Sequence, residues 1–264
     1  MLVIGERING MFEDVKAAVR DQNKSIIQDL AKRQLECGAN VLDINVGTAA
    51  RDREAAMKWL VEVVQEVTDA PLALDNPKPA VIKSVIGSCS NKVFINSTDG
   101  SEAKMGELFP LAAEHNASII ALTMNEEGVP PTADKRVEIA ATIFMAAMEH
   151  GITNEDLYID SIILPCNVPG KTVSLEVLEA IRQIQFLSDP PPHTVLGLSN
   201  VSQSTQERPL INRTYLVMVI AAGLDAAILD PMDTELVDAM ITAEMLMGRS
   251  LYCDSFLKAY RERQ

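Results

Sequence analysis

Acidic and amide side chains end almost every short apolar run of this sequence. They are Glu6, Asp43, Asn45, Asp75, Asn96, Asp160, Asn200 and Asp230. The fifth run is the exception, because it ends in Thr123 with Asn125 close behind. A single polar residue at such a position usually forms a turn or caps a helix. A succession made almost exclusively of Asp, Asn and Glu favours a shared binding site instead.

The chemistry of these groups limits what they could bind. Carboxylates accept hydrogen bonds, and carboxamides both donate and accept them. No lysine ends a run, which weighs against a Schiff-base enzyme. A sugar phosphate would call for Gly-rich turns after the seventh and eighth runs, which instead read LSNVSQ and LDPMDT. The set favours a neutral heterocycle rich in N–H groups, such as a pterin or a purine.

Short apolar runs alternate with longer amphipathic stretches along the whole chain. The runs predicted as strands are 2–6, 41–46, 72–75, 93–96, 119–124, 157–162, 195–200 and 226–230. Most are apolar on both alternating faces, as expected of parallel strands that helices cover. Helices are predicted over 51–67, 133–149, 172–187 and 209–222, with a closing helix after about Ser250.

This alternation predicts an α/β fold, a single (β/α)8 TIM barrel of the 264 residues. An open doubly wound sheet is the alternative, but the turn after its first strand would read G-x-G-x-x-G, and here it reads GERING. No linker or shift in composition marks a second domain, so residues 1–264 are predicted as one domain. In a barrel, the strand-end residues meet at the C-terminal mouth, where active sites are built.

Net charge and cysteine content limit the binding partners and the cellular compartment that we expect. The net charge is −14, from 37 acidic and 23 basic residues, and no Lys/Arg cluster offsets it, so no nucleic acid is expected. We also expect no secretion signal and no membrane partner, because no apolar run approaches about 20 residues. Four cysteines without a C-x-x-C pair indicate neither a disulfide framework nor a zinc site. A cytoplasmic protein is expected.

The three histidines offer no catalytic or metal-binding pattern. His115, His150 and His193 have no acidic or cysteine partners at ligand spacing, so no metal site is predicted. No histidine ends a strand, which argues against a Ser-His-Asp arrangement. The GKT sequence at 170–172 lacks the upstream glycine of a P-loop and is predicted to be a turn that enters a helix.

Seven segments carry a resemblance that runs along essentially the whole chain. They are MLVIGERING, VLDINVG, PLALDN, FINSTDG, LYIDSIILP, VLGLSNVSQSTQERPLINRTYL and AAGLDAAILDP. These segments resemble the methyltetrahydrofolate:corrinoid methyltransferases, and residues 197–213 are the most specific part. The resemblance implies a pterin-binding barrel that moves a methyl group between N5 of (methyl)tetrahydrofolate and the cobalt of a corrinoid by SN2 displacement.

The resemblance also implies roles for individual residues. Asn200 is expected to be catalytic, because its amide would lie beside N5 and stabilise the charge that develops there. The residues expected to bind the pterin or folate are Asp75, Asn96, Asp160, Gly197, Ser199, Gln203 and Arg208, the last two toward the corrinoid side. Asp43 and Asn45 are expected to support them from behind.

A corrinoid would then be the methyl donor or acceptor. The sequence has no D-x-H-x-x-G signature, so no histidine of this chain is expected to bind cobalt. Cobalamin would arrive free or on a separate corrinoid protein. The folate pocket does not fix the direction of transfer, because an enzyme stabilises the same transition state from either side. A homodimer is expected from the resemblance, with no interface identified.

Two other functions stay open at this point. A dihydropteroate synthase-like pterin enzyme would be expected to place cationic groups at the strand ends for a pyrophosphate, and the sequence lacks them there. A non-catalytic folate-binding or corrinoid-docking barrel would have no need of Asn200 and its loop. A turnover assay separates the non-catalytic barrel from the methyltransferase.

Overall fold

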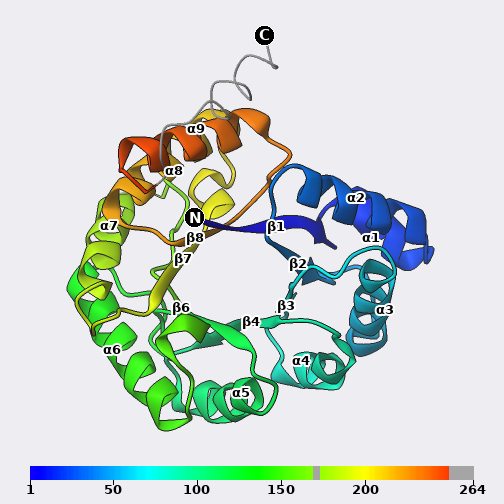
Figure 1. Cartoon of the computed structure of the whole chain (residues 1–264), viewed down its shortest axis with the longest axis horizontal. Helices are drawn as coiled ribbons and strands as arrows, with labels where there is room; N and C mark the ends of the chain where they lie inside the picture. The colour runs from blue at the N-terminus through cyan, green and yellow to red at the C-terminus, as the bar shows by residue number, and fades with distance from the viewer. Residues whose placement is uncertain (169–172, 250–264) are drawn as a thin grey trace.

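Eight parallel strands close into one barrel in the computed structural model, which describes residues 1–168 and 173–249. Strand β1 pairs with β2 on one side and with β8 on the other, and Figure 1 shows the helices around the strands. The predicted TIM barrel is therefore confirmed. The predicted closing helix and the GKT turn lie outside the described residues, so the single domain 1–264 stays a prediction.

The strands run in chain order around the barrel. They are β1 (Leu2–Asn9), β2 (Val41–Asn45), β3 (Leu72–Asp75), β4 (Val93–Asp99), β5 (Ser118–Leu122), β6 (Leu157–Asp160), β7 (His193–Gly197) and β8 (Ala226–Leu229). Register places Asn45 beside Asp75 and Asp75 beside Asn96, so three of the predicted polar residues lie at one level of the barrel.

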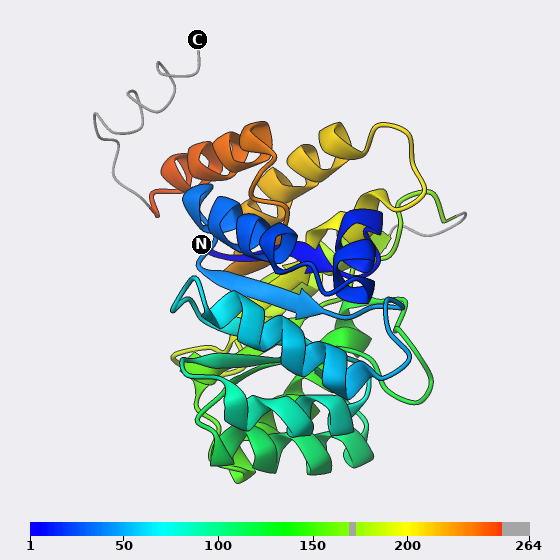
Figure 2. The same cartoon turned by 90° about the vertical axis from the view of Figure 1, so that its right-hand side faces the viewer.

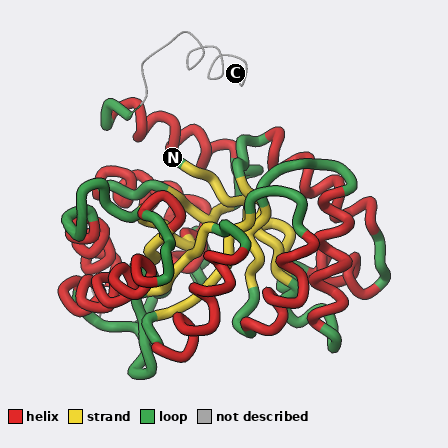
Figure 3. The backbone as a smooth tube through the Cα atoms, turned by 60° about the horizontal axis from the view of Figure 1, so that its bottom comes forward, coloured by secondary structure: helices red, strands yellow, loops and turns green. Residues whose placement is uncertain are grey.

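Helices surround the strands, as the red segments around the yellow ones in Figure 3 show. They are α1 (Glu13–Arg20), α2 (Lys24–Glu36), α3 (Arg53–Gln65), α4 (Pro79–Val85), α5 (Glu102–Glu114), α6 (Ala133–Glu149), α7 (Val173–Ile184), α8 (Arg208–Ala222) and α9 (Thr234–Leu246). Short 3-10 helices are η1 (Ile86–Ser88), η2 (Asn154–Asp156) and η3 (Leu198–Ser202). None of the described helices is long and apolar enough to cross a membrane.

Side chains at alternate positions of the strands point to opposite faces and form two hydrophobic cores. One set of side chains fills the barrel: Ile4, Val41, Ala73, Phe94, Ile120, Tyr158, Val195 and Ala226. The residues that alternate with them face outward and pack against the helices in a larger cluster. Strands that are apolar on both faces are buried on both faces, which is why the sequence shows nearly continuous apolar runs.

The predicted strand 195–200 is wrong at its end, because β7 stops at Gly197 and η3 follows. The buried apolar residues of this segment, Leu198 and Val201, are three apart, which fits a 3-10 helix and not the alternation of a strand. Gln203 N–H donates to the Asn200 carbonyl and closes the turn. Asn200 is therefore presented by a tight turn above the barrel instead of by a strand.

Candidate active site

Most of the polar residues predicted from the sequence lie at the C-terminal mouth of the barrel. Asp75, Asp160 and Gly197 are the last residues of their strands, and Asn96 lies within β4 beside Asp75. Figure 2 shows the barrel from the side, with the arrowhead of β2 (light blue) pointing toward the mouth. The strands thus bring residues from distant parts of the chain to one end of the molecule.

Amide and carboxyl groups of β2, β3 and β4 form two hydrogen-bonded pairs. Asn45 Nδ2 donates to Asp75 Oδ2 over 2.5 Å, and Asn96 Nδ2 donates to Asp43 Oδ1 over 2.9 Å. The Gly47 N–H donates to Asn45 Oδ1 over 2.6 Å, which fixes the orientation of that amide. Asp43 and Asn45 thus hold Asn96 and Asp75 in place, the arrangement expected of supporting residues.

Asp160 lies on the other side of the mouth, at the end of β6. Its side chain is buried, and Oδ1 accepts from the Ile162 N–H over 2.6 Å. The Gly197 N–H also donates to this carboxylate, so the end of β7 is tied to the end of β6. Two backbone donors fix Asp160 as a hydrogen-bond acceptor at the rim of the pocket.

Asn200 lies in η3, next to the end of β7. A Cβ atom built on Gly197 would meet Asn200 Nδ2 at 3.0 Å, so the missing side chain of Gly197 leaves room for the amide. Among residues 1–168 and 173–249, the amide of Asn200 has no hydrogen-bond partner, and the residue is exposed. The amide is consequently available to a ligand in the mouth.

Arg208, the first residue of α8, holds the η3 turn. Its Nε donates to Ser202 Oγ over 3.1 Å, and its NH2 group donates to the Ser199 carbonyl over 3.3 Å. Gln203 follows the turn and is exposed. The structure therefore joins Ser199, Asn200 and Arg208 in one unit, while the side chain of Gln203 lies at its outer edge.

Two charged residues at the mouth had no individual role in the sequence analysis, which placed Glu6 among the strand-end residues and did not consider Arg136. Glu6 Oε1 accepts from Ser199 Oγ over 2.6 Å, although 193 positions separate the two residues in the sequence. Arg136 of α6 is fully buried and donates to the carbonyls of Ser161 and Ile162, directly after Asp160. The signal for Arg136 was present, because it lies on the same helical stripe as Ala140, which is buried.

Burial raises the pKa of several carboxyl groups at the mouth. It raises the pKa of Glu6 to about 7 and those of Asp75 and Asp160 to about 6. The pKa of Asp43 is raised as well, first by burial and then by the charge of Asp75. Hydrogen bonds from Ser199, Asn45 and the backbone oppose these shifts only in part. Acceptors that have lost water are suited to a ligand with several N–H donors.

The donor set does not point to a metal ion. No group of three or more His, Cys, Asp or Glu side chains in the described part of the chain is arranged to hold one. The carboxylates of the mouth are instead paired with amides and backbone N–H groups. Such pairs are suited to the recognition of a neutral, hydrogen-bonding heterocycle.

A model of the family described as pterin binding enzyme matches residues 9–230 of the chain. The chain belongs to the family of pterin-binding enzymes. This pterin-binding enzyme is 31% identical over 266 residues to a methylcorrinoid:tetrahydrofolate methyltransferase of Eubacterium limosum, covering 99% of this chain and 97% of that protein. It is 33% identical over 243 residues to a methionine synthase of Mycobacterium tuberculosis, covering 86% of this chain and 20% of that protein.

Among solved structures, the pterin-binding enzyme is similar to the dihydropteroate synthase of Xanthomonas albilineans in complex with 7,8-dihydropteroate. The TM-score is 0.68, with 17% sequence identity over 93% of each chain. At this identity, the similarity shows the barrel fold that both proteins share.

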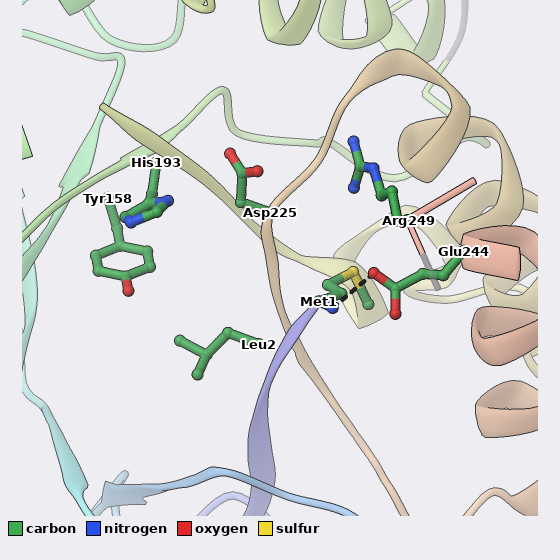
Figure 4. Close-up of a pocket in the computed structure, with 7 residues that line it drawn as sticks. All are labelled: Met1, Leu2, Tyr158, His193, Asp225, Glu244 and Arg249. Atoms are coloured by element: carbon green, nitrogen blue, oxygen red, sulfur yellow. Dashed lines mark hydrogen bonds and ion pairs between the residues drawn. The ribbon is translucent and has the colours of Figure 1, made fainter. Parts of the chain in front are cut away.

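A cavity of about 380 Å³ lies at the opposite, N-terminal end of the pterin-binding barrel (Figure 4). Its lining consists of Met1, Leu2, Tyr158, His193, Asp225, Glu244 and Arg249. The polar groups here bind one another: the Met1 ammonium contacts Glu244 at 2.6 Å, and Asp225 Oδ2 accepts from both N and Oγ1 of Thr194 at 2.9 Å. The amide of Asn200 at the mouth, in contrast, has no hydrogen-bond partner among the described residues.

Proposed function

We propose that this pterin-binding enzyme transfers a methyl group between N5 of tetrahydrofolate and the cobalt of a corrinoid. The observation that carries the proposal is the free amide of Asn200, which lies beside Gly197 at the rim of a mouth lined with buried carboxyl groups. Full-length similarity to a protein named methylcorrinoid:tetrahydrofolate methyltransferase supports the same reaction.

Asp75, Asn96 and Asp160 are proposed to bind the pterin ring of methyltetrahydrofolate or tetrahydrofolate. Asp75 uses Oδ2 for Asn45, and within the described residues its Oδ1 is left without a partner. Asp160 is buried and fixed as an acceptor, which matches the N–H and amino groups of the pyrimidine part of the ring. Both carboxylates would regain, from these donors, part of the solvation that burial removes.

Asn200 is proposed to assist the reaction at N5. When cob(I)alamin attacks the N5-methyl carbon, the cobalt–carbon bond forms and N5 keeps the electron pair of the breaking C–N bond. An amine anion is a poor leaving group, so N5 needs a hydrogen bond or a proton as the bond breaks. An amide N–H that strengthens its interaction with N5 in the transition state would accelerate transfer in either direction. Gly197 and Ser199 are proposed to form the floor of the pocket beside it.

The corrinoid is proposed to approach the η3 side of the mouth, either free or on a separate corrinoid protein. Gln203 is exposed there and Arg208 holds the turn, so this edge can contact a large second substrate while the folate stays in the mouth. Holding both reactants in one geometry would supply the orientation that a bimolecular transfer lacks in solution.

A homodimer is proposed through the exposed face of α8. Leu210, Val217 and Met218 lie on one stripe of this helix and are 61%, 40% and 38% exposed. Light scattering of the purified protein tests this: a mass of one chain contradicts it, and substitution of Leu210 by Glu should then separate a dimer into monomers.

The deciding experiment mixes the protein, without oxygen, with methylcob(III)alamin and tetrahydrofolate and follows cobalt by its visible spectrum. We expect formation of cob(I)alamin together with methyltetrahydrofolate, dependent on enzyme concentration. Tight binding of tetrahydrofolate by calorimetry without turnover, with free cobalamin and with a corrinoid protein, would instead indicate a non-catalytic folate-binding barrel. Formation of dihydropteroate from a pterin pyrophosphate would support the dihydropteroate synthase-like alternative.

A further inference from the structure

Glu6 is a partly buried carboxyl group that the proposed reaction does not yet use. It lies in β1, the strand between β8 and β2, and it accepts from Ser199 Oγ over 2.6 Å. Ser199 immediately precedes Asn200 in η3. One hydrogen bond therefore connects a carboxyl group of the first strand to the turn that presents the proposed catalytic amide.

Three charged groups, Asp230, Arg208 and Arg7, act on Glu6. Its pKa is raised to about 7, mainly by burial and in smaller part by the charge of Asp230, which follows β8, while the hydrogen bond from Ser199 opposes the rise. The charges of Arg208 on α8 and Arg7 on β1 lower it, while Glu6 itself helps to raise the pKa of Asp43 on β2. Glu6 thus exchanges a proton close to neutral pH.

We propose that Glu6 holds the proton that N5 gains in one direction of transfer and loses in the other, and that the Ser199 hydroxyl passes this proton toward N5. The inference rests on the proposed methyl transfer and adds the group that exchanges the proton. Because Glu6 acts through Ser199, it is a positioning and proton-holding residue that does not itself contact the folate.

The Ser199 hydroxyl is suited to this task because it can donate and accept at once. When Glu6 is a carboxylate, Ser199 donates to it, as the structure shows. When Glu6 is protonated, it can donate to Ser199, and the Ser199 O–H is then free to point into the mouth. The Asn200 amide can donate a hydrogen bond but keeps its protons near neutral pH, so the proton must come from another group.

The other carboxyl groups of raised pKa at the mouth lack such a partner. Asp75 and Asp43 accept from amide groups, and Asp160 and Asp230 accept from backbone N–H groups. Within the described residues, Glu6 is the carboxyl group of raised pKa that accepts from a hydroxyl. This difference in hydrogen-bond partner singles out Glu6 for proton transfer.

The proton and electron balance is complete in both directions. From methyltetrahydrofolate, the N5–CH3 bond breaks, cob(I)alamin supplies the electron pair of the new Co–CH3 bond, N5 takes a proton, and Glu6 becomes a carboxylate. In reverse, N5–H attacks the methyl group of methylcob(III)alamin, the cobalt keeps the electron pair as cob(I)alamin, and the proton returns to Glu6. No further oxidant or reductant takes part.

The test measures single-turnover transfer from methyltetrahydrofolate to cob(I)alamin between pH 5.5 and 8.5. The wild-type rate should fall as pH rises through about 7, because Glu6 is then no longer protonated. Glu6→Gln keeps an oxygen acceptor for Ser199 but has no proton to exchange. We expect a rate about tenfold to a hundredfold lower at pH 6, within the range of general acid catalysis, and loss of the step near pH 7.

Ser199→Ala tests the relay while the Glu6 carboxyl group stays in the chain. It should also remove the fall in transfer rate near pH 7. The double variant should be no slower than the slower single variant, because both substitutions interrupt the same proton path from Glu6 to N5. Glu244→Gln, at the opposite end of the barrel, is the matched control and should retain the wild-type rate and pH profile. Tetrahydrofolate affinity of Glu6→Gln and Glu244→Gln within about threefold of wild type, by calorimetry, verifies that the pocket is intact.

Infrared titration of the folate-free protein provides a readout that needs no turnover. A carboxyl band that titrates near pH 7 should be present in wild type and absent from Glu6→Gln. Absence of such a band in wild type, or transfer by Glu6→Gln with the wild-type rate and pH profile, overturns the inference and leaves the methyl transfer standing. Wild type that titrates as expected but never transfers a methyl group contradicts the proposed function instead.

Discussion

The two ends of the barrel use polar residues in opposite ways. At the N-terminal end, Asp225 accepts two hydrogen bonds from Thr194, the Met1 ammonium contacts Glu244, and Arg249 donates to the Leu224 carbonyl. These groups connect the starts of strands with one another, with α9 and with Arg249, which follows α9 in the chain. Polar groups that satisfy one another inside the fold contribute to its stability.

At the C-terminal end, Asp160 is buried and Glu6 and Asp75 are partly buried, and loss of water raises the pKa of each of these carboxyl groups. Their partners are amides, a hydroxyl and backbone N–H groups instead of contacting cations. Carboxyl groups that have lost water without gaining a cation lower the stability of the ligand-free protein. A ligand with N–H donors can restore that stability. The contrast teaches that stability and binding are assigned to different ends of one barrel, as is general for this fold.

Removal of the proposed catalytic amide should have the largest effect on the function assigned to the C-terminal end. Asn200→Ala should slow methyl transfer by about 10- to 1,000-fold, because one hydrogen bond to N5 in the transition state is lost. Tetrahydrofolate binding should change far less, since the carboxyl groups of the mouth stay in place. Single-turnover kinetics combined with calorimetry separate the two effects. A large loss of binding with unchanged turnover of the bound substrate would remove Asn200 from this role.

Asp160→Asn should weaken folate binding by about tenfold to a hundredfold, because one acceptor becomes a donor that faces the N–H groups of the pterin. The Ile162 and Gly197 N–H groups, which donate to Asp160, would also lose a charged acceptor. Calorimetric titration with tetrahydrofolate measures the change, and circular dichroism controls for folding. Unchanged affinity would exclude Asp160 from the pterin-binding residues.

The sequence predicts the fold well because periodicity and barrel architecture depend on local patterns. The helix predicted over 133–149 has the bounds of α6, and the run 72–75 has those of β3. Polar residues at strand ends also predict the mouth, because parallel strands bring their carboxyl ends to one side. Asp75 and Asn96, predicted separately, lie beside each other in register.

Contacts between distant segments could not be predicted in the same way. The hydrogen bond of Ser199 to Glu6 depends on how the barrel closes at β1 and β8, which no local pattern shows. The strand predicted over 195–200 was wrong at its end, because the buried residues Leu198 and Val201 are three apart and belong to η3. Arg136 could have been found, since a charged residue on an apolar helical stripe indicates a buried partner.

Gly197→Ala tests the same end of the barrel by displacing the Asn200 amide without removing it. The added Cβ would lie 3.0 Å from Asn200 Nδ2, so the amide must shift by a few tenths of an ångström. We expect methyl transfer to slow by about three- to tenfold, because small misplacements of groups at the reacting centre reduce rates. Thermal unfolding should be nearly unchanged, since the φ angle of Gly197 is −73° and alanine adopts it readily. Wild-type kinetics in this variant would show that the position of the amide is unimportant.

Two Asp→Asn substitutions, one at each end of the barrel, compare how the carboxyl groups of the two ends affect stability. Burial raises the folded-state pKa of Asp75 from 3.8 to about 6, so the folded protein binds more protons than the unfolded chain between these values. The stability that this group contributes is present below about pH 4 and is lost as pH rises through about 6. At pH 8, Asp75→Asn removes a buried charge and should raise the free energy of unfolding by about 1 kcal/mol, or Tm by about 2 °C.

Asp225→Asn at the other end should have the opposite sign. It replaces a charged acceptor of two hydrogen bonds and should lower Tm by about 2–4 °C. Methyl transfer should stay within about twofold of wild type, because Asp225 lies at the end of the barrel opposite the mouth. Circular dichroism melts of the folate-free protein at pH 5 and pH 8 provide the comparison, and the gain in Asp75→Asn should shrink at pH 5. Shifts of the same sign in both variants at pH 8 would show that the two ends are not specialised in this way.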